Sequence, residues 1–291
     1  MANLDLRPLS LGEILDRTFS IYRAHFLLFM GIAAVPQAFI LVFNLGETLL
    51  ITLPTNPVTA RAASSTLKPA MFGAFAAGAL LGGIVFFAAY IYSHGAAVNA
   101  VSDIYLGRPA TILGSFRKMR GHAANLLGVM ILNGLAVFAG FFVFIVGAFY
   151  AMCRLCTCVP AAILEDKGPS DSLGRSWELT QDNVGRALAI IALYFAISYA
   201  LVGLFSVPFL IMIGVATYQK SLAMIQFWTV MNTLGAFIGG TLATPVVTIA
   251  TTVFYYDLRV RKEAFDLQMM MATVPAVNQP PAAPSLPSPL S

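Results

Sequence analysis

Charged side chains are scarce in this sequence. They make up 10% of its 291 residues, whereas soluble domains contain about 25%. Hydrophobic residues make up 58%, and the mean hydropathy is +0.81. A water-soluble fold could not cover so much apolar surface with so few charges. The composition therefore excludes a soluble globular domain and predicts a protein whose natural solvent is lipid.

Cysteine is also rare, and its three copies all lie between positions 153 and 158. Such clustering does not fit a disulfide framework of the kind that holds small secreted domains. In a continuous helix, Cys153 and Cys156 would share one face while Cys158 points away. The segment is apolar as well, so we predict packing residues there and no metal site.

Histidine is equally sparse, with three copies in three separate segments, and no His/Glu motif accompanies them. No phosphate-binding loop and no acidic pair within an apolar run occur either. The sequence therefore predicts no catalytic residue, no metal and no cofactor, and we do not expect an enzyme. The histidines are His25, His94 and His122.

Acidic residues are outnumbered by basic ones, 13 to 17, and the isoelectric point is about 9.0. The basic residues occupy short loops between apolar runs, where they orient a protein in the membrane. This explanation is simpler than nucleic-acid binding, so no nucleic-acid partner is expected.

Long apolar runs fill most of the chain. A transmembrane helix needs about 20 apolar residues at a rise of 1.5 Å each. The run from 123 to 164 would be about 63 Å long as one helix, twice the ~30 Å thickness of the hydrocarbon core. We therefore predict two spans there, joined by a tight turn near Val146-Gly147-Ala148. The other expected spans are 26–43, 70–101, 187–218 with a break or kink at Pro208, and 222–256.

Six spans put both chain ends on one side, and the charges agree with this. Arg61, Lys68 and Lys220 lie on one face, Arg154 lies inside a span, and every other basic residue lies on the face with the termini. The positive-inside rule then predicts cytoplasmic termini in a multi-pass protein of the cell inner membrane. The expected parts are an amphipathic N-terminal cytoplasmic helix (1–25), a six-span membrane domain (26–256), a cytoplasmic extension of the last helix (257–271) and a disordered Pro-rich tail (272–291).

A short motif occurs three times on the predicted cytoplasmic side. Each copy has a proline, then Ser, Thr or Asp, then Leu-Gly, and the copies begin at Pro8, Pro109 and Pro169. Proline and hydroxyl residues mark helix starts, and short basic helices with an aromatic residue are typical of the membrane surface. The predicted fold is thus all-α and polytopic, with six transmembrane helices as three hairpins, each preceded by a short cytoplasmic interfacial helix. The alternative is that Pro, Ser and Gly simply recur in loops.

The same segments resemble a known bacterial family. Residues 6–16 (LRPLSLGEILD), residues 165–180 with their Gly-Arg-Ser-Trp sequence, and residues 245–263 ending in YYDLRVRKE are similar to the glycerophosphoryl diester phosphodiesterase membrane domain. The resemblance covers about residues 5–270. It implies a six-helix bundle and no defined activity for the membrane part, because the phosphodiesterase barrel fused to it in some members is not expected here.

Arg154 is a charge inside an apolar run. In a continuous helix it would lie about 16 Å from the cytoplasmic end, near the midplane, where a charge costs at least about 2.5 kcal/mol. It must then face the bundle interior or water. One interpretation is contact with an anion or a lipid headgroup. The other is a structural arginine that binds carbonyls exposed by Pro160 or by a helix break. Polar side chains such as Asn133, Tyr150 or Gln226 are further possible partners. His94 and Asn133 are further intramembrane polar candidates, although a satisfied buried histidine is the simpler interpretation of His94.

Glycine pairs at a spacing of four occur in two spans, at Gly78 and Gly82 and at Gly235 and Gly239. They let helices approach closely, and we expect them to pack within the bundle more than in a dimer seam. Prolines inside spans free backbone carbonyls, as in the broken helices of transporters, and static kinks fit equally well. These prolines are Pro36, Pro208 and Pro245.

A polar hinge between the fourth and fifth spans is the centre of the chain's third motif. Glu165 lies at the C-terminal end of a helix, where the macrodipole disfavours negative charge. Arg175 is the nearest cation after the turn at Gly168-Pro169, and Trp177 closes the segment. We predict a Glu165–Arg175 contact that folds the interfacial helix back onto the fourth span.

The expected function is non-enzymatic. We predict an integral inner-membrane protein that acts as a scaffold or lipid-interacting factor in envelope integrity. Its expected partners are membrane lipids with anionic headgroups at the cytoplasmic face, besides a possible protein that the sequence does not identify. The alternative is a small transporter or lipid translocator in which Arg154 contacts an anionic substrate.

Overall fold

The computed structural model describes residues 7–52, 67–143 and 145–264. Regular secondary structure within these residues is entirely helical. The expected extension 257–271 is therefore described only to residue 264, and the expected tail 272–291 lies outside the described residues. The helices are α1 (Leu11–Ala24), α2 (Phe26–Thr52), α4 (Leu67–Tyr105), α5 (Ile112–Lys118), α6 (Ala123–Val143), α7 (Ile145–Arg154), α8 (Cys158–Leu164), α9 (Pro169–Thr180), α10 (Val184–Tyr218) and α11 (Leu222–Glu263).

Six helical stretches in the described part of the chain are long and apolar enough to cross a membrane. This confirms an all-α, multi-pass integral membrane protein. The stretches are Phe26–Gly46, Ala76–Tyr105, Ala123–Phe142, Val146–Leu164, Val184–Tyr218 and Leu222–Glu263.

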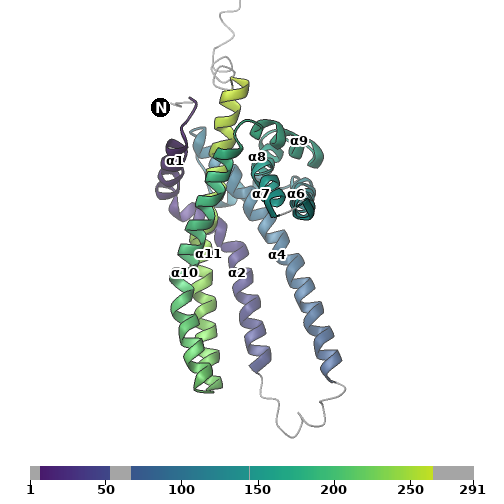
Figure 1. Cartoon of the computed structure of the whole chain (residues 1–291), viewed down its shortest axis with the longest axis vertical. Helices are drawn as coiled ribbons and strands as arrows, with labels where there is room; N and C mark the ends of the chain where they lie inside the picture. The colour runs from purple at the N-terminus through teal and green to yellow at the C-terminus, as the bar shows by residue number, and fades with distance from the viewer. Residues whose placement is uncertain (1–6, 53–66, 144, 265–291) are drawn as a thin grey trace, which may run out of the picture.

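Helix α11 is the element on which the others assemble. It contacts α1, α2, α4, α8, α9 and α10, and it is buried almost continuously from Thr241 to Leu258. Figure 1 shows α10 and α11 side by side along the long axis, with α2 and α4 running in the same general direction. The coils of α6 and α7 are seen close to end-on, so this pair runs across the other long helices (Figure 1).

Two glycines bring α10 and α11 together, as their spacing predicts. A Cβ added to Gly235 would overlap the carbonyl group of Phe205 in α10, and one added to Gly239 would lie 2.9 Å from the Cα of Val202. A Cβ on Gly82 would meet the Phe43 ring of α2 at 2.6 Å, whereas one on Gly78 would have no neighbour within 4 Å. Packing within the bundle is thus confirmed for three of the four glycines.

The apolar run from 123 to 164 forms two spans, as predicted, and they part slightly before the predicted turn near Val146-Gly147-Ala148. Helix α6 ends at Val143 and α7 begins at Ile145, so Gly147 lies within α7. A Cβ on Gly140 would lie 2.8 Å from the carbonyl oxygen of Gly147. The absence of a side chain at Gly140 therefore allows α6 and α7 to pack closely.

Helix α10 continues through Pro208 from Val184 to Tyr218, so the predicted alternative of a break is wrong and that of a kink stays a prediction. A proline removes one backbone hydrogen bond, while apolar surroundings offer the remaining backbone groups no competing partner. The interruption occurs in the fourth span, where α7 ends at Arg154 and α8 begins at Cys158. This break also removes the single helical face on which we placed Cys153 and Cys156.

The three motif copies do start helices. Ser10 caps α1 through a reciprocal pair of hydrogen bonds with Glu13, and the Thr111 hydroxyl accepts from the Gly114 N–H at the start of α5. Pro169 is the first residue of α9. The Ser10 backbone N–H, then the Ser10 hydroxyl and Arg7, hold the pKa of Glu13 at about 2. Local capping chemistry therefore fixed these starts.

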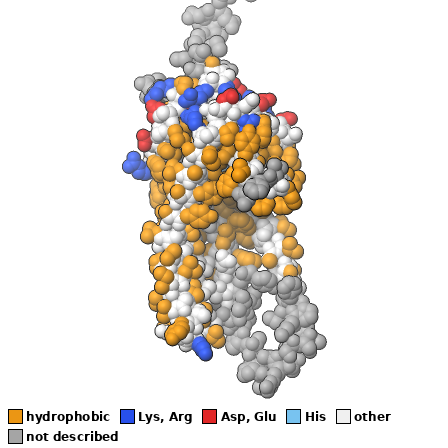
Figure 2. Space-filling model, viewed as in Figure 1, with side chains coloured by type: hydrophobic (Ala, Val, Ile, Leu, Met, Phe, Trp, Pro, Cys, Tyr) orange, Lys and Arg blue, Asp and Glu red, His pale blue; other side chains and the backbone are white. Residues whose placement is uncertain are grey.

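Charged side chains gather at one end of the molecule. Figure 2 shows Lys, Arg, Asp and Glu together at the end where α11 finishes, above a surface that is largely hydrophobic on the visible face. The ion pairs of α9 and α11 belong to this end. One polar end on an apolar body is the distribution expected of a protein embedded in a bilayer.

Candidate functional site

The break between α7 and α8 is held by α9. The Arg154 carbonyl oxygen accepts hydrogen bonds from the hydroxyls of Ser176 (2.8 Å) and Thr180 (2.9 Å). The Thr157 hydroxyl lies 2.9 Å from that of Ser176. All three hydroxyl residues are fully buried. Side chains from another helix therefore satisfy the carbonyl that the break exposes.

The guanidinium of Arg154 forms none of the hydrogen bonds that satisfy the backbone at this break. The residue is only 3% exposed, yet no hydrogen bond or ion pair of its side chain occurs among the described residues, and its Nε is buried without a partner. The guanidinium carbon lies 4.2 Å from the ring centre of Trp177 and 5.8 Å from that of Tyr150. No hydrogen bond from this guanidinium to a carbonyl occurs among the described residues, and Ser176 and Thr180 occupy the Arg154 carbonyl; Tyr150, one of the predicted polar partners, does contact the guanidinium.

Two aromatic rings separate Arg154 from the surface. Tyr150 of α7 and Trp177 of α9 meet edge to face with ring centres 5.9 Å apart, and both side chains are about half exposed. Cation–π contacts stabilise a charge, although they satisfy none of its N–H groups. The site is thus a buried cation with unused donors behind an accessible aromatic pair, an arrangement suited to an anion at the membrane surface.

The predicted contact between Glu165 and Arg175 is confirmed. The Arg175 Nε donates to both Glu165 carboxylate oxygens at 3.0 and 3.1 Å, and α9 lies against α8. Gly168 precedes the first turn of α9, and Pro169 begins it. Trp177, which we assigned to this hinge, instead covers Arg154.

Glu165 has further partners that the sequence did not indicate, and one of them comes from α11. The Tyr255 hydroxyl donates to it at 2.6 Å, Lys167 lies 2.8 Å away, and Arg175 also pairs with Glu263. Burial raises the pKa of Glu165, but the hydrogen bonds from Lys167, Tyr255 and Arg175 outweigh it, and the pKa is lowered overall. Because Tyr255 is 90 residues away in the chain, no local pattern could have revealed it.

Asp257 forms a second polar cluster that sequence reasoning missed. Its carboxylate is fully buried and accepts from the Leu9 N–H at 2.6 Å, Arg186 at 2.8 Å and Arg261 at 3.0 Å. The two arginines also donate to the Leu9 carbonyl, each at 2.6 Å. The cluster thus joins the segment before α1, the start of α10 and the end of α11. The signal that could have revealed Asp257 is its position directly after Tyr255 and Tyr256, which the structure shows to be buried.

Acidic residues near the ends of three helices take part in comparable pairs. Asp103 near the end of α4 pairs with Lys118 of α5 at 2.6 Å. Glu165 after α8 pairs with Arg175 of α9, and Asp257 of α11 holds the backbone before α1. In each case the acid binds the short helix of a motif copy or the segment leading into it. This is the geometric counterpart of the sequence repeat.

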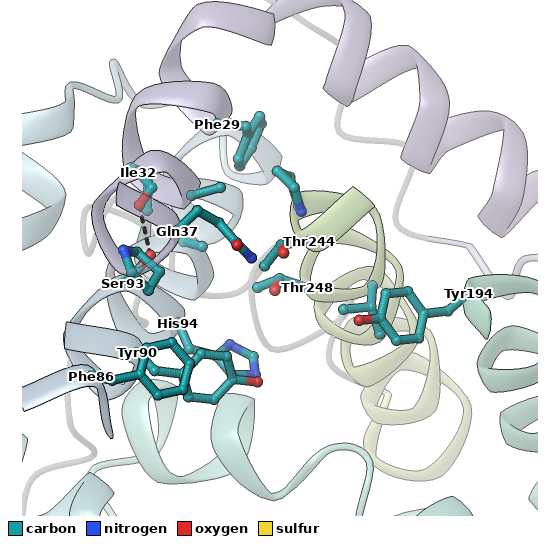
Figure 3. Close-up of a pocket in the computed structure, with 15 residues that line it drawn as sticks. Phe29, Ile32, Gln37, Phe86, Tyr90, Ser93, His94, Tyr194, Thr244 and Thr248 are labelled. Atoms are coloured by element: carbon teal, nitrogen blue, oxygen red, sulfur yellow. Dashed lines mark hydrogen bonds between the residues drawn. The ribbon is translucent and has the colours of Figure 1, made fainter. Parts of the chain in front are cut away.

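His94 lies apart from Arg154, beside a cavity of about 190 Å³ between α2, α4, α10 and α11. Figure 3 shows this space with Gln37, Thr244 and Thr248 around it, and with the hydroxyl of Tyr194 directed toward it. The His94 Nδ1 is buried and has no hydrogen-bond partner among the described residues. Arg154 is not among the residues that line this cavity.

The remaining polar candidates do not join either site. Asn133 of α6 is partly buried with an unpartnered Oδ1. His122 lies 3.3 Å from Asp166 near the hinge. Within the described residues, no three His, Cys, Asp or Glu side chains are grouped so as to hold a metal ion.

Comparison with known proteins supports the resemblance. The family model described as "Membrane domain of glycerophosphoryl diester phosphodiesterase" matches residues 115–278. The matched segment contains Arg154, Glu165 and Asp257, whereas His94 and the motif at 6–16 lie outside it. No curated protein and no solved structure matches the chain.

Proposed function

The chain belongs to the family of the glycerophosphoryl diester phosphodiesterase membrane domain, and from this premise we propose that it is a non-enzymatic, lipid-interacting protein of the cell inner membrane. In this proposal the protein binds an anionic lipid headgroup at the cytoplasmic face. It thereby contributes to envelope integrity, either alone or as a scaffold for a partner protein. The family description refers to a membrane domain, and it is not taken as an activity of this chain.

The observation that carries the proposal is the buried Arg154 side chain, whose Nε has no hydrogen-bond partner and whose guanidinium, within the described part of the chain, contacts only aromatic rings. A charge in an apolar site costs free energy unless a counter-charge or hydrogen-bond acceptor completes it. The backbone at the helix break is already satisfied by α9, so the guanidinium is available for a ligand. A phosphate oxygen matches arginine donors, and the Tyr150–Trp177 pair suits the level of the headgroups.

The alternative, transport of an anionic substrate past Arg154, requires a cavity that reaches this residue. His94 lines the cavity of about 190 Å³, but Arg154 does not. A lipid that reaches Arg154 from the side, past two half-exposed aromatic rings, needs no such cavity. This difference favours a lipid-interacting role over transport.

The lipid site is tested by replacing Arg154 with Met, which keeps an apolar stem and removes the charge. Native mass spectrometry of protein purified in mild detergent is expected to detect bound phosphatidylglycerol or cardiolipin in the wild type, and about tenfold less in R154M. R154K should retain part of the binding, because it keeps the charge and loses the planar fork of donors.

The matched control is Arg120→Met, which removes the same charge from an exposed position. Equal lipid binding by R154M and R120M would contradict the proposal. Thermal unfolding of each variant separates the two roles of Arg154, because a purely structural arginine would lower stability without a selective change in bound lipid. A deletion strain that R120M rescues and R154M does not would connect the site to envelope integrity.

The proposed orientation places α1, α5 and α9 at the cytoplasmic surface as interfacial helices, each leading into a hairpin of spans. It is supported by the charged end of the molecule, by the ion pairs that bind α5 and α9, and by the hydrogen bond from the Leu9 N–H before α1 to Asp257. Both termini would then be cytoplasmic.

The orientation predicts opposite labelling of two exposed positions, Lys220 between α10 and α11 and Arg120 after α5. In intact spheroplasts, K220C should react with a membrane-impermeant maleimide, and R120C should react only after lysis. The native cysteines are buried or partly buried, so wild-type protein supplies the background. Labelling of both cysteines from the same side would overturn the proposed topology.

A further inference from the structure

The cavity beside His94 is a second place where polar groups lack partners. It occupies about 190 Å³, room for on the order of six water molecules. Its walls come from four helices: α2 and α4 supply most of them, α11 supplies Thr244 and Thr248, and α10 supplies Tyr194. Figure 3 shows the Gln37 amide, the two threonines and the Tyr90–His94 pair around one space.

Two prolines line this space, and hydroxyl groups nearby bind backbone carbonyls. Pro36 and Pro245 both line it, and a proline inside a helix frees the carbonyl four residues earlier. The carbonyl freed by Pro36, that of Ile32, accepts a hydrogen bond from Ser93 at 2.6 Å. Thr244 is likewise engaged, since its hydroxyl donates to the Gly240 carbonyl at 2.8 Å. The hydroxyls of Ser93 and Thr244 are therefore already hydrogen-bonded to backbone carbonyls.

Other polar side chains around the cavity are not engaged. The His94 Nδ1 is buried without a partner, and its ring lies 5.7 Å from that of Tyr90, edge to face. Within the described residues, no side-chain hydrogen bond is formed by Gln37, Tyr90 or Tyr194. An amide, an imidazole and two phenols thus offer both donors and acceptors to whatever fills the space.

The charge of the lining restricts the occupant. The residues that line the cavity include no Asp, Glu, Lys or Arg. An anion or a cation would therefore lose its hydration without gaining a counter-charge. A neutral molecule with hydroxyl groups avoids this cost, satisfies the free amide, imidazole and phenols, and can place its C–H groups against Phe29 and Phe86.

We propose that this cavity is a binding site for a small, uncharged, hydroxylated molecule, held by Gln37, Tyr90, His94 and Tyr194. The site is independent of the lipid site at Arg154, because the two share no lining residue.

Three probes with one carbon skeleton test the charge argument: 1,2-propanediol, lactate and protonated 1-amino-2-propanol. Saturation-transfer NMR on the whole chain in nanodiscs should give a signal for propanediol about fivefold or more above those of the two ions. Equal signals from all three probes would overturn the proposal. The absence of any signal from propanediol would also overturn it, because water would then be the occupant of the cavity.

Variants locate the binding. Ala97→Leu fills the space from α4, and His94→Leu removes the unpartnered nitrogen; each should reduce the propanediol signal about fivefold or more. Thr252→Val is the control, because its hydroxyl bonds the Thr248 carbonyl and it is not part of the lining. If A97L fails to fold, H94L decides. An unchanged signal in a folded A97L or H94L variant would contradict the site, whatever happens to lipid binding in R154M.

Discussion

Replacing Asp257 with Asn is expected to lower the free energy of unfolding by about 3–5 kcal/mol, the usual cost of breaking a buried ion pair from one side. The wild-type carboxylate is fully buried and binds Arg186, Arg261 and the Leu9 N–H. Asparagine keeps the shape but directs an NH₂ group at two guanidinium groups. Both cations then lose their counter-charge, and the loss weighs most on Arg186, whose side chain is only 22% exposed.

The effect should appear as earlier loss of helix signal when sodium dodecyl sulfate is added to the protein in mixed micelles. Asp182→Asn is the matched control, since Asp182 also pairs with a basic residue, Lys262 at 3.1 Å, but its side chain is 75% exposed. Exposed pairs contribute about 0–1 kcal/mol. If D257N and D182N unfold at the same detergent fraction, the Asp257 cluster does not hold the α1 segment to α10 and α11.

Replacing Gly235 with Ala is expected to destabilise the α10–α11 pair by about 1–3 kcal/mol, as overpacking of close contacts does. The added methyl would overlap the Phe205 carbonyl and come within 3.1 Å of the Phe209 ring. A side chain can change rotamer, but a carbonyl fixed in a helix cannot move alone, so the two helices must separate. We expect a lower midpoint of thermal unfolding in detergent.

Gly78→Ala provides the control in another span. A Cβ at Gly78 would have no neighbour within 4 Å, and alanine favours a helix over glycine by about 1 kcal/mol. G78A should therefore be neutral or slightly more stable. Gly235 packs against α10 of its own chain, so G235A should act on the monomer. A variant that unfolds like wild type and only loses an oligomer would show that this packing is wrongly assigned.

The sequence alone determined the features that depend on composition and on neighbouring residues. Apolar runs predicted the membrane class, because the bilayer allows only helices or closed barrels to cross it. Pro169 and the hydroxyls of Ser10 and Thr111 predicted three helix starts, because capping acts within one turn. The Glu165–Arg175 contact could be predicted for the same reason, since ten residues and one turn separate the partners.

Other features were decided only by the tertiary structure. The Tyr255 partner of Glu165 and the Leu9 partner of Asp257 come from distant parts of the chain, and hydrogen bonds between them leave no local pattern. Arg154 could be identified as an unusual charge, but not its unpartnered state. That state follows from α9, whose Ser176 and Thr180 reach the Arg154 carbonyl across the helix break and leave the guanidinium behind Trp177. A side chain's freedom to bind a ligand depends on which neighbours have already used the surrounding donors and acceptors, and those neighbours are assembled only when the helices pack.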